Sequence, residues 1–69
     1  MEKFIYALNE DDKKFLLANG YEELFSCRIN GSKAYAFNNN LPSIYATFSK
    51  EDKTKFLVSN VALYLTGGN

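Results

Sequence analysis

The side chains that could carry chemistry in this chain of 69 residues are carboxylates and one thiol, since it contains no histidine. The carboxylates cluster at Glu10–Asp12, Glu22–Glu23 and Glu51–Asp52. The first and last clusters directly follow Asn9 and Ser49, which are good helix N-cap residues. Acidic residues in a first helical turn stabilise the positive end of the helix dipole. These clusters therefore indicate helix starts rather than a general acid paired with a general base.

The thiol belongs to Cys27, which alternates with Phe25 and Ile29 in a run typical of a β-strand. A cysteine in such a run is expected to be buried and unreactive. A single cysteine excludes an intramolecular disulfide, and the lack of histidine removes the usual zinc ligand sets. No glycine-rich phosphate loop is present. The sequence thus predicts a non-catalytic protein without a metal or cofactor, and the unpaired thiol favours a cytoplasmic location.

Length and charge restrict the class of protein and of partner. With 69 residues, of which 46% are apolar, the chain is expected to form one domain over residues 1–69. Eight Lys+Arg balance eight Asp+Glu, so no net field attracts nucleic acid or an anionic membrane. The apolar run Phe4–Leu8 is too short for a signal peptide or a membrane span. The charge is uneven, however: residues 1–27 sum to −3 (three Lys, six acids) and residues 28–69 to +3 (five basic residues, two acids).

Short strands and helices must position these side chains. The expected elements are strands over residues 3–8, 21–29, 32–37 and 44–48, and helices from residue 10 to about 19 and from residue 50 onward. The dipeptide Asn30-Gly31 is the strongest short hairpin signal. Gly20 is a natural helix stop, because glycine adopts the left-handed conformation without strain.

The end of the second helix is open between two possibilities. Apolar residues at helical spacing, with Gly67 as a stop, favour a helix to about residue 65. These residues are Phe56, Leu57, Val61, Tyr64 and Leu65. Alternatively, the helix ends near Asn60 and residues 61–65 form a last strand. Either way the fold class is α+β, an antiparallel sheet of three to four strands with two helices on one face, and a last strand would make it ferredoxin-like.

The tight turn determines which hairpin residues share a face of the sheet. One face is predicted to carry Leu24, Ser26, Tyr35 and Phe37, with Arg28 and Lys33 near the tip. The other is predicted to carry Phe25, Cys27, Ile29, Ala34 and Ala36. Two helices of this size can cover one face of such a sheet, and the bulkier aromatic face is expected to pack on them.

The smoother face is then left as an exposed apolar patch, which usually marks an interaction site. We expect it to bind a protein, either a second copy of the chain in a homodimer or another protein, with Arg28 and Lys33 at the rim. The alternative is that the loop over residues 38–43 or the chain ends cover this face.

Two segments of predicted strand, Lys33–Phe37 and Ile5–Asn9, share a pattern of aromatic and small residues. Lys33–Phe37 resembles the first part of the RNP1 strand of the RNA-recognition motif family, and Ile5–Asn9 resembles its RNP2 strand. The resemblance implies an alternative function, binding of single-stranded nucleic acid by aromatic stacking on one sheet face. That face would consist of Tyr6, Tyr35 and Phe37. The other interpretation of these aromatics is that they belong to the core.

Phe15–Tyr21, followed by residues 35–38, is similar to small uncharacterised proteins of Firmicutes phages and mobile elements. The similarity covers about residues 4–40: a helix ending in Leu-x-x-Gly-aromatic and a hairpin closing on an aromatic-x-Phe strand. It implies a context, because small phage proteins often bind and block a host protein, as anti-CRISPR and other anti-defence proteins do. The expected function is stoichiometric protein binding in a bacterial cytoplasm, by self-association or by occluding a host protein.

Overall fold

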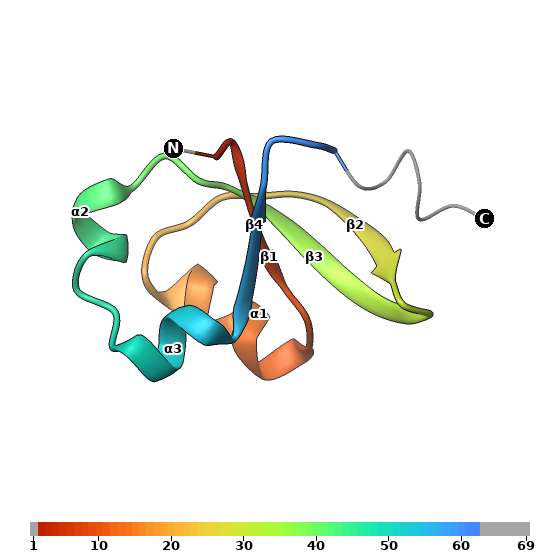
Figure 1. Cartoon of the computed structure of the whole chain (residues 1–69), viewed down its shortest axis with the longest axis horizontal. Helices are drawn as coiled ribbons and strands as arrows, with labels where there is room; N and C mark the ends of the chain where they lie inside the picture. The colour runs from red at the N-terminus through yellow and green to blue at the C-terminus, as the bar shows by residue number, and fades with distance from the viewer. Residues whose placement is uncertain (1, 63–69) are drawn as a thin grey trace.

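A computed structural model describes residues 2–62, which form a four-stranded antiparallel sheet and three short helices (Figure 1). The strands are β1 (Phe4–Ala7), β2 (Glu23–Ile29), β3 (Ser32–Asn38) and β4 (Phe56–Ser59). The helices are α1 (Glu10–Ala18), α2 (Pro42–Tyr45) and α3 (Lys50–Thr54). The predicted α+β class is confirmed. None of the helices in residues 2–62 has the length and apolar character needed to span a membrane.

The strand order in the sheet is β2-β3-β1-β4. β3 therefore lies between β1 and β2, which α1 connects, and β1 lies between β3 and β4, which α2 and α3 connect. Each helical connection thus joins two strands that are separated by a third. This is the split β-α-β arrangement of ferredoxin-like folds, which the sequence left open as an alternative.

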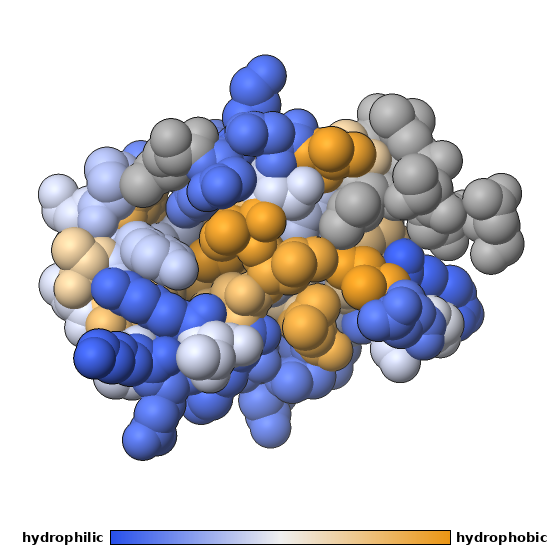
Figure 2. All heavy atoms as spheres, in the orientation of Figure 1, coloured by the Kyte–Doolittle hydropathy of each residue, from blue (hydrophilic) through white to orange (hydrophobic). Residues whose placement is uncertain are grey.

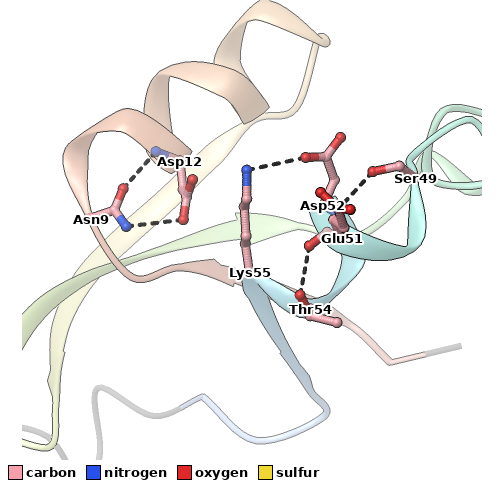
Figure 3. Close-up of polar contacts among 7 residues, drawn as sticks. All are labelled: Asn9, Asp12, Ser49, Glu51, Asp52, Thr54 and Lys55. Carbon is pink, nitrogen blue, oxygen red and sulfur yellow. Dashed lines mark hydrogen bonds and ion pairs between the residues drawn. The ribbon is translucent and has the colours of Figure 1, made fainter.

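The predicted helix starts are confirmed at both acidic clusters. The Asn9 side chain accepts a hydrogen bond from the Asp12 amide at 2.8 Å, and the Ser49 hydroxyl accepts one from the Asp52 amide at 3.1 Å (Figure 3). Each cap satisfies an amide that the first helical turn leaves without a partner. The other end of α1 is Ala18, and Gly20, the predicted helix stop, follows two residues later with a φ of +91°.

The hairpin forms around the predicted turn. Asn30 and Gly31 have φ angles of 54° and 81°, as a two-residue turn between twisted strands requires. The register agrees with the prediction from the pair Ile29–Ser32 to the pair Phe25–Ala36. A bulge between Glu23 and Phe25 then shifts it, so Glu23 lies opposite Phe37 in place of Leu24. The predicted pairing of Leu24 is wrong because one extra residue is accommodated there.

The strand predicted over residues 44–48 is wrong. This segment contains the end of α2, which begins at Pro42. Proline has no amide hydrogen to lose at a helix start, and its fixed φ suits the first turn. Ile44 and Tyr45 pack against the core from this short helix.

The favoured long second helix is also wrong, because α3 ends at Thr54 and β4 follows. In β4, Phe56 lies opposite Ala7 and Val58 lies opposite Ile5. The last strand therefore starts earlier than the predicted alternative over residues 61–65. Val61 and Ala62 follow β4 outside any strand, and residues 63–65 of that prediction lie outside the described residues.

The helices pack on one face of the sheet, and the core lies between them. Its buried members are Ile5, Ala7, Leu16, Tyr21, Tyr35, Phe37, Phe48 and Phe56. Aromatic rings account for much of the contact: the Phe15 ring lies 5.1 Å from that of Phe48, which lies 6.0 Å from that of Phe56. The prediction that the aromatic face of the hairpin packs on the helices is confirmed for Tyr35 and Phe37, whereas Leu24 and Ser26, predicted on the same face, are exposed.

Candidate protein-binding surface

The sheet face turned away from the core carries the apolar residues expected to bind a partner. Cys27 lies opposite Ala34, Phe25 lies opposite Ala36, and Tyr6 lies between Ala36 and Leu57 of its two neighbouring strands. Residues directly opposite in antiparallel strands point to the same side. We call this side the second face; its members are Phe4, Tyr6, Phe25, Cys27, Ile29, Ala34, Ala36 and Leu57. Phe4, Tyr6 and Leu57 are additions to the predicted set.

The middle of the second face is shielded by the chain itself. The rings of Phe4, Tyr6 and Phe25 contact one another with centroids 5.8–6.3 Å apart. The Tyr6 hydroxyl donates a hydrogen bond of 2.8 Å to the Val61 carbonyl, so the segment after β4 reaches this face. In Figure 1 this segment turns away from β4 toward the side of the sheet where β3 and β2 lie.

The prediction that the two alanines of β3 are exposed is wrong. Ala36, which lies opposite Tyr6 and Phe25, is fully buried, and Ala34, which lies opposite Cys27, is 1% exposed. They form the floor of the second face rather than a contact surface. Of the alternative in which the loop over residues 38–43 or the chain ends cover this face, the described residues show one contact, the hydrogen bond from Tyr6 to Val61.

The accessible apolar surface lies toward the margins of the second face. On β2, Phe25, Cys27 and Ile29 are half-buried, and on β4 Leu57 is 39% exposed. Figure 2 shows hydrophobic residues at the surface near the centre of the view, where the edge strand β4 crosses in front of β1 in Figure 1. Both β2 and β4 are edge strands of the described sheet. β2 is the longer of the two, at seven residues against four.

A pocket next to the hairpin tip extends this margin toward β1. It is lined by Leu8, Ile29, Asn30, Ser32, Lys33 and Ala34. Its volume of about 250 Å³ lies below the roughly 300–1,000 Å³ typical of small-molecule sites. We therefore treat it as part of a protein-binding surface rather than as a ligand site.

The thiol of Cys27 has the environment expected of a structural cysteine. The side chain is half-buried among apolar neighbours, and this burial raises the pKa of the thiol above its ordinary value. A raised pKa keeps the group in the poorly nucleophilic thiol form at neutral pH. Within residues 2–62, no three Cys, Asp or Glu side chains come close enough together to hold a metal ion.

Arg28 and Lys33 do not form the rim of the second face. They lie opposite each other, but one residue out of phase with Cys27 and Ala34, so they point to the helix side. The Arg28 guanidinium donates to the Gly31 carbonyl at 3.0 Å, and the Lys33 ammonium lies 5.5 Å from the centroid of the Tyr35 ring. Both cations remain exposed at the hairpin tip.

The three aromatics assigned to nucleic-acid stacking do not share a face. Tyr35 and Phe37 lie opposite Ala7 and Ile5 on the core side, whereas Tyr6 belongs to the second face. The Tyr35 hydroxyl donates to the Glu10 carboxylate at 3.1 Å, and burial followed by this contact raises the pKa of the phenol. Phe37 is fully buried. The predicted stacking face is therefore wrong, because stacking needs exposed rings on one surface.

The added residues of the second face carried a partial signal in the sequence. Phe4 alternates with Tyr6 along the first strand, which places both on one side. Leu57 was hidden by the assignment of residues 56–59 to a helix.

No protein-family model matches the chain, and neither a curated protein nor a solved structure is found to match it.

Proposed function

We propose that this chain is a small non-catalytic protein-binding module that acts stoichiometrically through the β2 margin of its sheet. The observation that carries this proposal is the character of β2. It is a seven-residue edge strand without proline, with Cys27 and Ile29 half-buried on the second face and Leu24 43% exposed. An edge strand presents backbone N–H and C=O groups that can pair with a strand of a partner.

The non-catalytic part of the proposal is supported by what the reactive groups do. The amides of Asp12 and Asp52 are bound by the N-cap side chains Asn9 and Ser49, so their clusters serve as first helical turns. The Lys13 ammonium lies 3.7 Å from the Glu23 carboxylate. The remaining candidate nucleophile, Cys27, has a raised pKa.

The proposed setting is the cytoplasm of a bacterial host. The resemblance of residues 4–40 to small phage proteins and the unpaired thiol of Cys27 support it. In that setting the module would associate with itself or occupy the surface of a host protein, as an anti-defence inhibitor or an accessory protein. Either mode is stoichiometric, because one β2 edge pairs with one strand.

The experiment compares two substitutions of Ser26, the central residue of β2. Ser26 lies between residues hydrogen-bonded to β3, so its own N–H points to the open edge. Ser26→Pro removes that donor, and proline is tolerated on edge strands, whereas Ser26→Thr keeps the donor and serves as the matched control. Melting temperatures establish that both variants fold.

We expect the native chain and Ser26→Thr to bind a protein in a fixed ratio, measured by sedimentation of the chain alone and by titration with any purified partner. Ser26→Pro should bind at least about tenfold more weakly, because it lacks one backbone hydrogen bond and carries a ring at the edge. Equal binding by Ser26→Pro and Ser26→Thr, in both measurements, would overturn the proposal.

A further inference from the structure

The backbone groups that β2 offers to a partner follow from its pairing with β3. The pair Ile29–Ser32 closes a two-residue turn and exchanges hydrogen bonds across the hairpin, and hydrogen-bonded pairs alternate with open pairs from there. Cys27 is therefore bonded to β3, whereas Ser26 and Arg28 point their N–H and C=O groups away from it. The bulge next to Leu24 interrupts this alternation. The regular outward-facing residues of β2 are thus Ser26 and Arg28.

We propose that the partner of β2 is a second copy of this chain, paired antiparallel across a two-fold axis that passes beside Cys27. This inference rests on the function proposed above and names the partner of the same surface. In this register Ser26 lies opposite the partner's Arg28, and Arg28 opposite the partner's Ser26. Each of these pairs exchanges two N–H···O bonds, so every regular outward group of both strands is used.

The adjacent registers of the same two strands use fewer of these groups. A shift by one residue would place second-face side chains opposite helix-side ones, which antiparallel pairing does not permit. A shift that places Ser26 opposite the partner's Ser26 needs Leu24 as the next bonded residue, and Leu24 lies in the bulge. The register with Cys27 opposite the partner's Cys27 avoids both problems.

Charge is self-complementary in this arrangement, which favours a second copy over an unrelated peptide. The chain entering β2 carries Glu22 and Glu23, and the hairpin tip carries Arg28 and Lys33, all exposed. An antiparallel pair of identical strands brings the acidic start of each β2 to the basic tip of the other. The two-fold axis makes this contact twice, and opposite charges on neighbouring strands are stabilising. On the two paired strands these are Arg28 and Glu23, of which Glu23 also pairs with Lys13 of its own chain, while Lys33 lies one strand further away on β3.

The apolar surface is also continuous across the axis. Ile29 lies opposite the partner's Phe25, and Cys27 lies opposite the partner's Cys27, all on the second face. The half-buried margins of both copies would thereby lose further contact with water. Both sheets would join into one, with α1 of each copy on the same side.

Cys27 supplies the test. Residues that face each other in an open antiparallel pair have Cα atoms about 4.5 Å apart, within the roughly 4.4–6.8 Å that a disulfide requires. Mild oxidation with copper phenanthroline should therefore join two native chains covalently through Cys27. The control is the double variant Cys27→Ser with Ser26→Cys, which moves the thiol by one residue to the other side of the sheet, opposite the partner's Arg28. We expect it to form the covalent dimer at least about tenfold more slowly, since its two thiols are not facing.

Sedimentation equilibrium without oxidant separates the outcomes. We expect a reversible dimer for the native chain and for Cys27→Ser, and a monomer for Ser26→Pro. The native chain could instead be a monomer that binds another protein, with this binding lost in Ser26→Pro. That result would overturn the inference that the partner is a second copy, and the proposed function would still hold. A dimer that Ser26→Pro does not weaken, or faster cross-linking by the shifted thiol than by Cys27, would also overturn this inference. If Ser26→Pro weakens neither self-association nor binding to another protein, the proposed function is overturned as well.

Discussion

Removing the Tyr6 hydroxyl tests how firmly the segment after β4 is held on the second face. The substitution Tyr6→Phe keeps the ring that contacts Phe4 and Phe25 and deletes the donor of the 2.8 Å hydrogen bond to Val61. Loss of a hydrogen bond of this kind costs about 0.5–1.5 kcal/mol, and the cost rises to about 2 kcal/mol when the partly buried carbonyl is left unpaired. We therefore expect the free energy of unfolding to fall by about 1–2 kcal/mol, the upper part of that range applying if no water replaces the hydroxyl.

Chemical and thermal denaturation followed by circular dichroism measure this loss. For a domain of this size, 1 kcal/mol corresponds to a shift of about 4–8 °C in Tm, so Tm should fall by about 4–16 °C. The slope of the urea transition should stay the same, since the same surface is exposed on unfolding. Tyr35→Phe is the matched control on the other face, where the hydroxyl bonds to the exposed Glu10 at a longer 3.1 Å. A loss for Tyr6→Phe no larger than that for the control would refute the reasoning.

Three further substitutions or conditions test other parts of the structure. Ala36→Lys places a cation at a fully buried position and should lower the free energy of unfolding by about 2 kcal/mol or more; Ile29→Lys, at a half-buried position, should cost clearly less in the same urea titration. Asn9→Ala removes the N-cap of α1 and should cost about 1 kcal/mol by thermal denaturation. The raised pKa of Tyr35 in the folded chain means that its stabilising contribution is complete below pH 10, its ordinary value, and is lost as the pH rises through the folded value. The alkaline loss of stability should therefore be shallower in Tyr35→Phe, and an unchanged pH profile would contradict this.

The parts of the fold that depend on local signals were predictable from the sequence. Asn30-Gly31 requires positive φ at two successive residues, which few other pairs tolerate, and the hairpin register follows directly from it. The caps at Asn9 and Ser49 are equally local, because each side chain binds an amide three residues on. These features identified the second face on β2 and β3 correctly from Phe25 to Ile29.

The errors lie where long-range contacts decide. A short run such as Phe56–Ser59, with three apolar residues and a serine, fits a helix and a strand alike, and pairing with β1 settles the choice. The faces of Tyr6 and Tyr35 depend on how β1 pairs with β3, some thirty residues away, and no turn joins those two strands. The burial of Ala36 likewise requires the Phe4–Tyr6–Phe25 ring contacts and the crossing of Val61, none of which has a local signature.

Amide hydrogen exchange of β2, followed residue by residue by NMR at increasing protein concentration, tests most directly whether this edge binds a second copy. The amides of Cys27 and Ile29 are bonded to β3 and should be protected at every concentration. Those of Ser26 and Arg28 point outward, so they should exchange fast in dilute solution and become protected as the dimer forms. Fast exchange of Ser26 and Arg28 up to the highest concentration, with Cys27 and Ile29 protected throughout, would contradict pairing of β2 with a second copy.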